Sequence, residues 1–243
     1  MIELLGIGLR SPRGEWLLRR VGVRLETPEL TFVVADDRRA RTALLDIMAA
    51  RQVADEGRAW LGGRPVTRET ASTIAARIAD VQLHTPFVAH RSVLSNLTPR
   101  RWSHRIIRAL LRGQRPEAWE RTLRTLQSVG LGSCVDTPVA ALDDWRRRRL
   151  SLARALMHQP DHLLVREIDD ALPAAQAADV LGVLRTLAHV ERVPVVVSTA
   201  DSMLVYLFAD RVLTLAGGRL VFNGSPGLAA AAASSPKELA PVG

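Results

Sequence analysis

The chain has 243 residues, 47% of them hydrophobic, which is enough to bury one large core or two modest ones. It contains no run of about 20 apolar residues, and its first residues are too charged for a signal peptide, so we expect neither a membrane-spanning helix nor a cleaved leader. The single cysteine, Cys134, excludes an intramolecular disulfide and suits a reducing compartment. The formal net charge of +8 favours anionic partners, although an arginine-rich composition alone also accounts for it.

The first 35 residues alternate short β-like runs with turns. The runs cover 2–9, 17–26 and 30–35, and turn residues that include proline separate each run from the next. This pattern predicts an antiparallel β region that leads into the first strand of a core sheet.

From residue 30 onward, a strand, a polar loop and a helix follow one another, which is the setting of a phosphate-binding loop. The spacing agrees with G-x-x-x-x-G-K-S/T, but Ala35 and Ala40 stand at the two glycine positions. Arg41 stands at the lysine and Thr42 at the hydroxyl residue. Because glycine lets the amides of such a loop approach phosphate closely, alanine there costs strain or forces another loop shape. We expect the helix over 43–50.

The same loop carries charges of both signs. Arg38, Arg39 and Arg41 are candidates to attract an anion at the N-terminus of the helix. Asp36 and Asp37 place negative charge beside them. Two interpretations follow: a remodelled phosphate site, or a remnant that only connects strand to helix. We favour the connector.

Residues 142–171 have the pattern of a helix, a turn and a short buried strand. Apolar residues dominate the helical surface after a very basic stretch at 146–149. Pro160 stops the helix because it disfavours the helical conformation of the preceding residue. The strand 162–165 has the composition of one buried on both faces of a parallel sheet, and charge returns at Arg166.

The segment 151–167, SLARALMHQPDHLLVRE, resembles the stretch between the signature and Walker B motifs of ABC-transporter ATP-binding subunits. Two further marks agree in order and spacing. One is SVLSNL at 92–97, which follows Gln82 by about ten residues, and the other is the final hairpin within 206–226. The resemblance covers roughly residues 1–226.

The resemblance implies an α/β, P-loop NTPase-like (ABC ATPase) core with a mostly parallel sheet, an N-terminal antiparallel β region and a helical subdomain. It implies one domain over 1–226, with the helical subdomain inserted at about 92–157, and a low-complexity tail over 227–243. It also implies that Gln82 is the glutamine of the Q-loop and that Glu167 is the general base of ATP hydrolysis.

Several positions depart from the pattern that this family uses to hydrolyse ATP. The signature reads LDDWR at 142–146, and its two carboxylates would repel a γ-phosphate. Arg166 stands where the resemblance places the aspartate of the Mg²⁺ site, and its charge would oppose the cation. Pro173 replaces the D-loop aspartate, and Ala200 replaces the switch histidine.

These features give three functional hypotheses. The first is a subunit that has lost ATP hydrolysis, holds no cofactor and acts as a structural or regulatory partner in a membrane transport complex. The second is a working subunit that binds ATP and Mg²⁺, with Arg41, Thr42 and Glu167 carrying the chemistry. The third, a nucleic-acid-binding module, rests only on charge and ranks last; it predicts tight binding with a steep salt dependence.

The resemblance also implies partners and a location. We expect a membrane permease subunit, a second ABC ATPase subunit, or both, as partners. We expect the chain to be cytoplasmic and peripheral at the inner face of the membrane. Glu167 is the candidate catalytic residue, and no residue is singled out as a metal ligand. The candidate nucleotide-site residues are Arg38, Arg39, Ala40, Arg41, Thr42 and Gln82.

Overall fold

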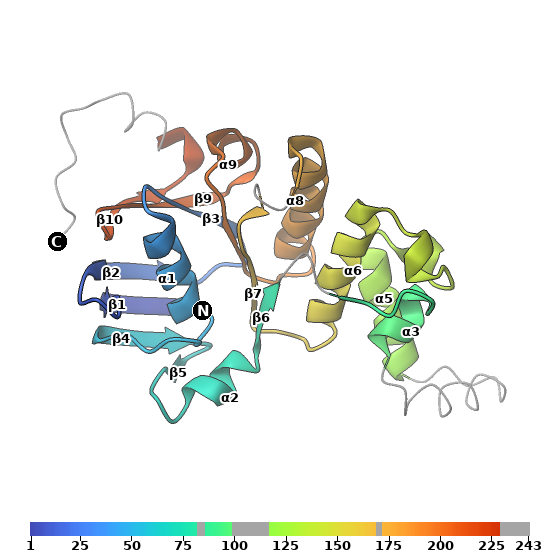
Figure 1. Cartoon of the computed structure of the whole chain (residues 1–243), viewed down its shortest axis with the longest axis horizontal. Helices are drawn as coiled ribbons and strands as arrows, with labels where there is room; N and C mark the ends of the chain where they lie inside the picture. The colour runs from blue at the N-terminus through green and yellow to red at the C-terminus, as the bar shows by residue number, and fades with distance from the viewer. Residues whose placement is uncertain (82–85, 99–116, 169–171, 229–243) are drawn as a thin grey trace. The chain divides into compact units, whose positions relative to one another are not determined.

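The computed structural model describes residues 1–81, 86–98, 117–168 and 172–228 (Figure 1). The chain forms two compact units, one from Met1–Asp80 with Pro160–Gly243 and one from Val81–Gln159. The described part of the first unit holds two β-sheets with their helices, whereas that of the second is built from helices.

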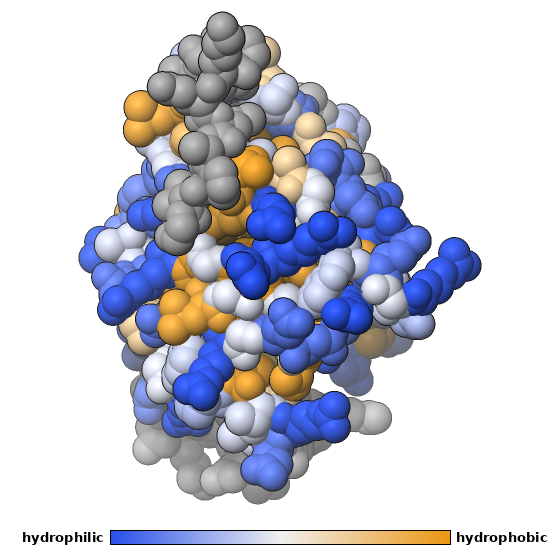
Figure 2. All heavy atoms as spheres, turned by 90° about the vertical axis from the view of Figure 1, so that its left-hand side faces the viewer, coloured by the Kyte–Doolittle hydropathy of each residue, from blue (hydrophilic) through white to orange (hydrophobic). Residues whose placement is uncertain are grey.

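The first unit begins with a four-stranded antiparallel sheet in the order β2-β1-β4-β5. Its strands are β1 (Ile2–Arg10), β2 (Trp16–Leu25), β4 (Glu56–Leu61) and β5 (Arg64–Pro65). In β2, Val23 and Leu25 are buried whereas Arg24 between them is exposed, so one face packs inward and the other meets solvent. Figure 2 shows the side of the molecule where this sheet lies, with hydrophilic and hydrophobic side chains interspersed. The predicted N-terminal antiparallel region is confirmed.

A second sheet has six strands in the order β10-β9-β3-β8-β7-β6 and is mostly parallel. Its strands are β3 (Leu30–Ala35), β6 (Ile78–Val81), β7 (His162–Val165), β8 (Val195–Ser198), β9 (Arg211–Ala216) and β10 (Arg219–Gly224). Every residue of β7 and β8 is buried, as expected for strands covered on both faces. The pairing of β9 with β10 is antiparallel and forms the predicted final hairpin. The predicted α/β fold class is confirmed.

Helices cover this second sheet from both sides (Figure 1). The helices of the first unit are α1 (Arg38–Met48), α2 (Ala71–Ala75), α8 (Ala174–His189) and α9 (Ser202–Phe208). Contacts join α1 to β2 and β3, and α8 to β3 and β8. One hydrophobic cluster includes Leu44 of α1, Leu18 of the antiparallel sheet and Val33 of the core sheet. Because each buried CH₂ contributes about 0.8 kcal/mol, this cluster fixes α1 between the two sheets.

The second unit is organised around α6 (Asp144–Leu156), which contacts α3 (Val93–Leu97) and α5 (Glu117–Ser128). Short 3-10 turns at Gly132–Cys134 and Val139–Ala141 join α5 to α6. The basic segment RRWSHRIIRALLR at 100–112, whose pattern predicts an amphipathic helix, lies outside the described residues.

Asn96, in the SVLSNL segment of the second unit, makes hydrogen bonds that fix the start of α3. Its Oδ1 accepts a hydrogen bond from the Val88 N–H at 2.8 Å, and its Nδ2 donates to the Ser92 carbonyl at 3.0 Å. A single amide side chain therefore ties the start of α3 to the chain that precedes it. Across the described ranges of both units, no helix combines the length and apolar character needed to cross a bilayer.

His162, the first residue of β7, makes the stability of the first unit depend on pH. Its side chain is buried, and its Nε2 lies 3.0 Å from the carbonyl oxygen of Met48 at the end of α1. Burial lowers the pKa of His162 below its ordinary value of 6.5. The unfolded chain therefore binds more protons in mild acid, so the contribution of this residue is fully present above about pH 6.5 and is lost as the pH falls.

We expect His162→Gln to weaken the loss of unfolding free energy between about pH 7.5 and about pH 5.5, because glutamine donates to Met48 and does not titrate. Urea unfolding at each pH measures this dependence. His158→Gln is the matched control, since His158 is exposed, and it should leave the pH dependence as it is in the wild type. An unchanged slope in His162→Gln would contradict the assignment.

Candidate functional site

The connection between β3 and α1 is a short turn rather than an open loop. Only Asp36 and Asp37 lie between the last residue of β3 and the first residue of α1. No residue from 35 to 42 adopts a positive φ, so the left-handed conformations that favour glycine are absent from this stretch. The helix was expected from residue 43, which is wrong, because it begins at Arg38. With Ala35 and Ala40 at the glycine positions, the connection therefore has a different shape from a glycine-rich phosphate-binding loop. Ala40, Arg41 and Thr42 lie within the helix.

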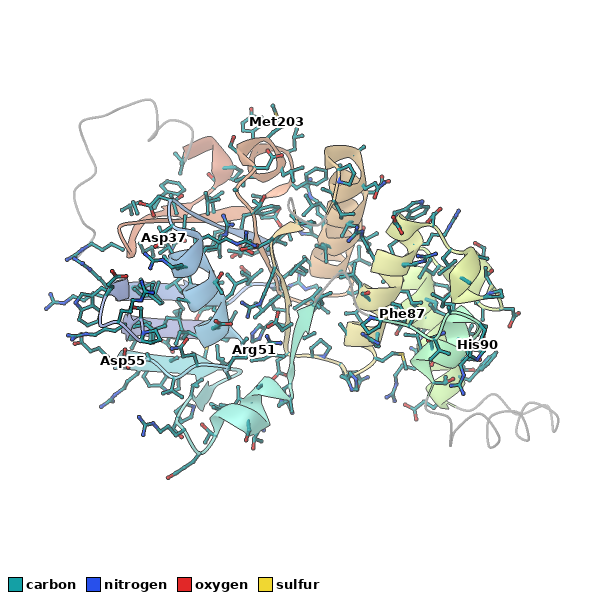
Figure 3. The ribbon with its side chains drawn as sticks, in the orientation of Figure 1. Asp37, Arg51, Asp55, Phe87, His90 and Met203 are labelled. Carbon is teal, nitrogen blue, oxygen red and sulfur yellow. The ribbon has the colours of Figure 1, made fainter. Side chains whose placement is uncertain are left out.

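Two carboxylates accept hydrogen bonds from backbone N–H groups at the start of α1. Asp37 caps the helix, since its Oδ1 accepts the N–H of Arg39 at 2.8 Å, and this bond lowers the pKa of Asp37. Asp36 accepts the N–H of Asp37 at 2.8 Å and that of Gly217, in the β9–β10 turn, at 3.1 Å. Figure 3 shows Asp37 at this end of α1. A helix N-terminus is a natural anion site, and here the chain supplies the anion.

The side chains of Arg39 and Thr42 are exposed to solvent. Arg39 lies 3.2 Å from Glu15 and 3.2 Å from Asp37, and its side chain is largely exposed. Thr42 helps to line a hollow of about 540 Å³ beside the β1–β2 turn. The other residues that line it are Ser11, Pro12, Arg13, Leu17, Arg38, Arg39, Ala43, Asp46 and Gln52. Ala40 is buried against the core.

Two arginines converge on Glu167. Arg38 donates through Nε to Glu167 Oε1 at 2.8 Å and through Nη2 to Oε2, which makes a bidentate pair. Arg41 brings Nη2 to 3.5 Å from the same Oε1, and its Nη1 donates to the Thr199 carbonyl at 3.1 Å. The Arg41 side chain is only 6% exposed and that of Glu167 is 16% exposed. The arginine at the lysine position of the motif is therefore engaged by a carboxylate of the chain itself.

The backbone of Glu167 is unusual. Its φ is 49°, in the left-handed region that a residue with a side chain seldom adopts. The Glu167 N–H donates to Ser198 Oγ at 2.8 Å, which ties the end of β7 to the end of β8. This bond and the two arginines hold the residue in a conformation that it would not favour by itself.

Arg166, the residue after β7, forms ion pairs with the carboxylates of Asp80 and Asp46. Its Nε and Nη2 donate to the two oxygens of Asp80 at 2.9 and 2.8 Å, and Nη2 lies 2.8 Å from Asp46 Oδ1. Burial opposes the charge of Arg166, but the hydrogen bond and charge of Asp80 and the charge of Asp46 outweigh it and raise its pKa. Arg51, which follows α1 (Figure 3), adds a contact of 3.0 Å to Asp80. A guanidinium thus bridges α1 and β6 at the position where the resemblance implies a metal-binding carboxylate.

Sequence reasoning missed Asp46 and Asp80, the partners of Arg166. Each stands as a single acid within an apolar segment, ALLDIM and IADV. A lone carboxylate in such a setting requires a buried partner, and this is the signal that could have marked them. Ser198 and Thr199, at the end of β8, were likewise not recognised as partners of Glu167 and Arg41.

In the second unit, the signature position forms a self-contained helix start. Asp143 caps α6, because its Oδ1 accepts the N–H of Arg146 at 3.0 Å. Its Oδ2 accepts from Nη1 of the same arginine at 2.7 Å. Asp144 pairs with Arg147 at 3.6 Å. A carboxylate therefore caps the N-terminus of α6, as another caps the N-terminus of α1.

The remaining predicted positions are less informative. Gln82 lies outside the described residues. Pro173 directly precedes α8, and Ala200 follows Thr199 at the end of β8. Asp201 caps α9 by accepting the N–H groups of its first turn.

We expect Arg166→Ala to lower the free energy of unfolding by about 2 to 3 kcal/mol, because it removes the cation that Asp46 and Asp80 share and leaves their charges balanced only in part by Arg51. Arg166→Asp should cost more, since it adds a third carboxylate to the pair. Urea unfolding with comparison of m-values measures both losses.

Arg185→Ala is the control, because it removes an exposed arginine from α8. It should change the free energy of unfolding by less than about 0.5 kcal/mol. If Arg166→Asp proved as stable as the wild type, the bridging role of Arg166 would be wrong.

Known proteins resemble the chain in sequence and in fold. The family model described as "ABC transporter" matches residues 41–169. A phosphonates import ATP-binding protein of Natronomonas pharaonis is 31% identical over 211 residues, which cover 86% of this chain and 87% of that protein. A protein of the same name from Thiobacillus denitrificans is 24% identical over 226 residues, covering 93% and 87%.

Among solved structures, cbiO1 of Clostridium perfringens, part of the ABC transporter complex cbiONQ, superposes with a TM-score of 0.79 at 17% identity, covering 95% of this chain and 90% of that one. At this identity the superposition shows the fold alone. The family match spans more than half of the chain, and the relative from Natronomonas pharaonis is similar over nearly its whole length. The chain is therefore a member of the ABC transporter ATP-binding family.

Proposed function

We propose that this chain is an ABC-family subunit that does not hydrolyse ATP and that serves as a structural or regulatory partner in a membrane transport complex. The observation that carries the proposal is the engagement of Arg38 and Arg41 by Glu167. Hydrolysis needs a cationic side chain at the start of the helix that is free to bind phosphate. It also needs a carboxylate that is free to accept a proton from the attacking water. Here each of these groups neutralises the other.

The residues present do not fit bound MgATP. Asp36 and Asp37 accept the amides that phosphate oxygens would use, and their charges would repel a polyphosphate. Arg166 places a cation, held by two aspartates, where Mg²⁺ would need an oxygen ligand. Three charged residues at two separate places in the chain thus work against one ligand, which is more than a single altered residue would do.

The second unit supports the same proposal. In the family, the signature motif of one subunit faces the phosphate bound by another. Asp143 and Asp144 place carboxylates at this turn, and Asp143 already fills the cap of α6. Neither half of a shared site would then be provided by this chain. A role through docking on a membrane permease, a second ABC subunit, or both, at the cytoplasmic side of the membrane is what the preserved fold supports.

One observation favours a second candidate, an ATP-binding subunit with a non-standard site. Thr42 and Arg38 line the hollow of about 540 Å³ beside the β1–β2 turn, and Glu167 is retained at the position of the general base. For this candidate, nucleotide would have to displace Glu167 from both arginines.

Titration of the purified chain with MgATP separates the two candidates. A ligand at about 100 times its Kd adds roughly 2.7 kcal/mol to the folded state. We expect no rise in melting temperature at millimolar MgATP, and no release of phosphate above that of a buffer blank.

A rise in melting temperature that Arg41→Ala removes and Arg19→Ala retains would favour the second candidate. Arg19 is an exposed residue of β2, so its substitution controls for the loss of one charge. Phosphate release that Glu167→Gln abolishes, by the chain alone or with its transport partners, would refute a non-catalytic role.

A further inference from the structure

We propose that Arg38 and Arg41 form a binding site for a small oxyanion, and that the chain fills this site with its own carboxylate, Glu167. The inference rests on the proposed function and deepens it, because it assigns Glu167 the role of an internal ligand rather than that of a general base. Removal of the carboxylate should then open the site to acetate or inorganic phosphate.

The arrangement of the two arginines is that of an anion clamp. Arg38 and Arg41 are three residues apart in α1, so their side chains lie on the same face of the helix. Both reach the same oxygen of Glu167, at 2.8 Å and 3.5 Å. Without the anion between them, two guanidinium groups held this close would repel each other.

Burial makes an anion at this place a requirement of the fold. Arg41 is only 6% exposed, and a buried cation is costly unless it is paired. The Thr199 carbonyl provides one neutral partner at 3.1 Å, which leaves the charge to be balanced. Glu167 supplies that balance without any bound ligand, so the site is complete in the chain alone.

The conformation of Glu167 indicates that this contact determines where the residue sits. Its φ of 49° is unfavourable for a residue with a Cβ atom, so this conformation carries a cost in free energy. The surrounding contacts must offset that cost. They are the bond to Ser198 Oγ and the pairs with the two arginines.

The neighbouring Arg166 makes the complementary substitution. It provides the cation that Asp46 and Asp80 require, so this pair of carboxylates also needs no external ion. An internal anion and an internal cation therefore lie on consecutive residues after β7. The charges that a bound metal–phosphate ligand brings to such a site are both present within the chain.

The experiment compares Glu167→Ala, which removes the carboxylate and opens space, with Glu167→Gln, which removes the charge and keeps the volume. Melting temperatures are measured in sodium acetate, sodium phosphate and sodium chloride at matched ionic strength. We expect Glu167→Ala to melt below the wild type in chloride and to recover in acetate or phosphate, with an apparent affinity at least about tenfold above that of the wild type. General stabilisation by phosphate is shared by all variants and is subtracted with Glu167→Gln.

Two double variants test whether Arg41 holds the anion. Glu167→Ala combined with Arg41→Ala should lose the response to acetate and phosphate, whereas Glu167→Ala combined with Arg19→Ala should keep it. If Glu167→Ala does not fold in chloride, the yield of refolded protein in acetate or phosphate replaces the melting temperature as the readout.

The outcomes separate this inference from the proposed function. If neither acetate nor phosphate restores Glu167→Ala, the internal-ligand role is wrong, while an absence of MgATP hydrolysis would still support the non-catalytic subunit. If the wild type binds phosphate as tightly as Glu167→Ala does, the site is not filled by Glu167 and the inference is overturned. Hydrolysis of ATP by the wild type would overturn both.

Discussion

The ion-pair cluster of Glu167 with Arg38 and Arg41 is the interaction on which the centre of this molecule depends. Arg41 is held in a nearly closed environment, where an isolated charge would be far more costly than in water. The cluster ties the first turn of α1 to the end of β7, and Ser198 extends the connection to β8. Three elements that are distant in the sequence are thereby fixed at one edge of the core sheet.

The same principle operates in the turn before α1 and at the start of α6. Each helix start presents unpaired amides and a partial positive charge, which in this fold can attract phosphate. Here Asp37 and Asp143 cap the two helices from within the chain. Together with Arg166, which neutralises Asp46 and Asp80, these caps place a counter-charge for each of these groups within the chain. The structure is thus consistent with a family member whose fold persists while its charged site serves its own stability.

This substitution has a consequence for how an ABC-type fold can be maintained. The hydrophobic cluster that joins α1 to both sheets consists of apolar side chains, so its packing does not itself require the charges at the helix start. Loss of the glycine conformations at 35–42 therefore changes the loop and leaves the packing of α1 intact. Selection on a proposed docking role would act on this scaffold, whereas the ion pairs balance the charges that the fold gathers at the start of α1 and the end of β7.

The sequence by itself determined the order of the elements, the antiparallel start, the parallel core with its closing hairpin, and the family. These follow from local features, namely apolar periodicity, proline and glycine breaks and motif spacing. Each such feature can be recognised within a short stretch of the sequence. The sequence also singled out Arg38, Arg41 and Glu167 as candidate site residues. Only the tertiary structure decided that they bind one another, because the partners are 129 and 126 positions apart and no local pattern encodes such a pairing. The partners of Arg166 were missed for the same reason, since Asp80 lies 86 positions away. The start of α1 was placed too late for a different reason: the motif spacing assigned residues 36–42 to a loop, although Asp37 is a local capping signal.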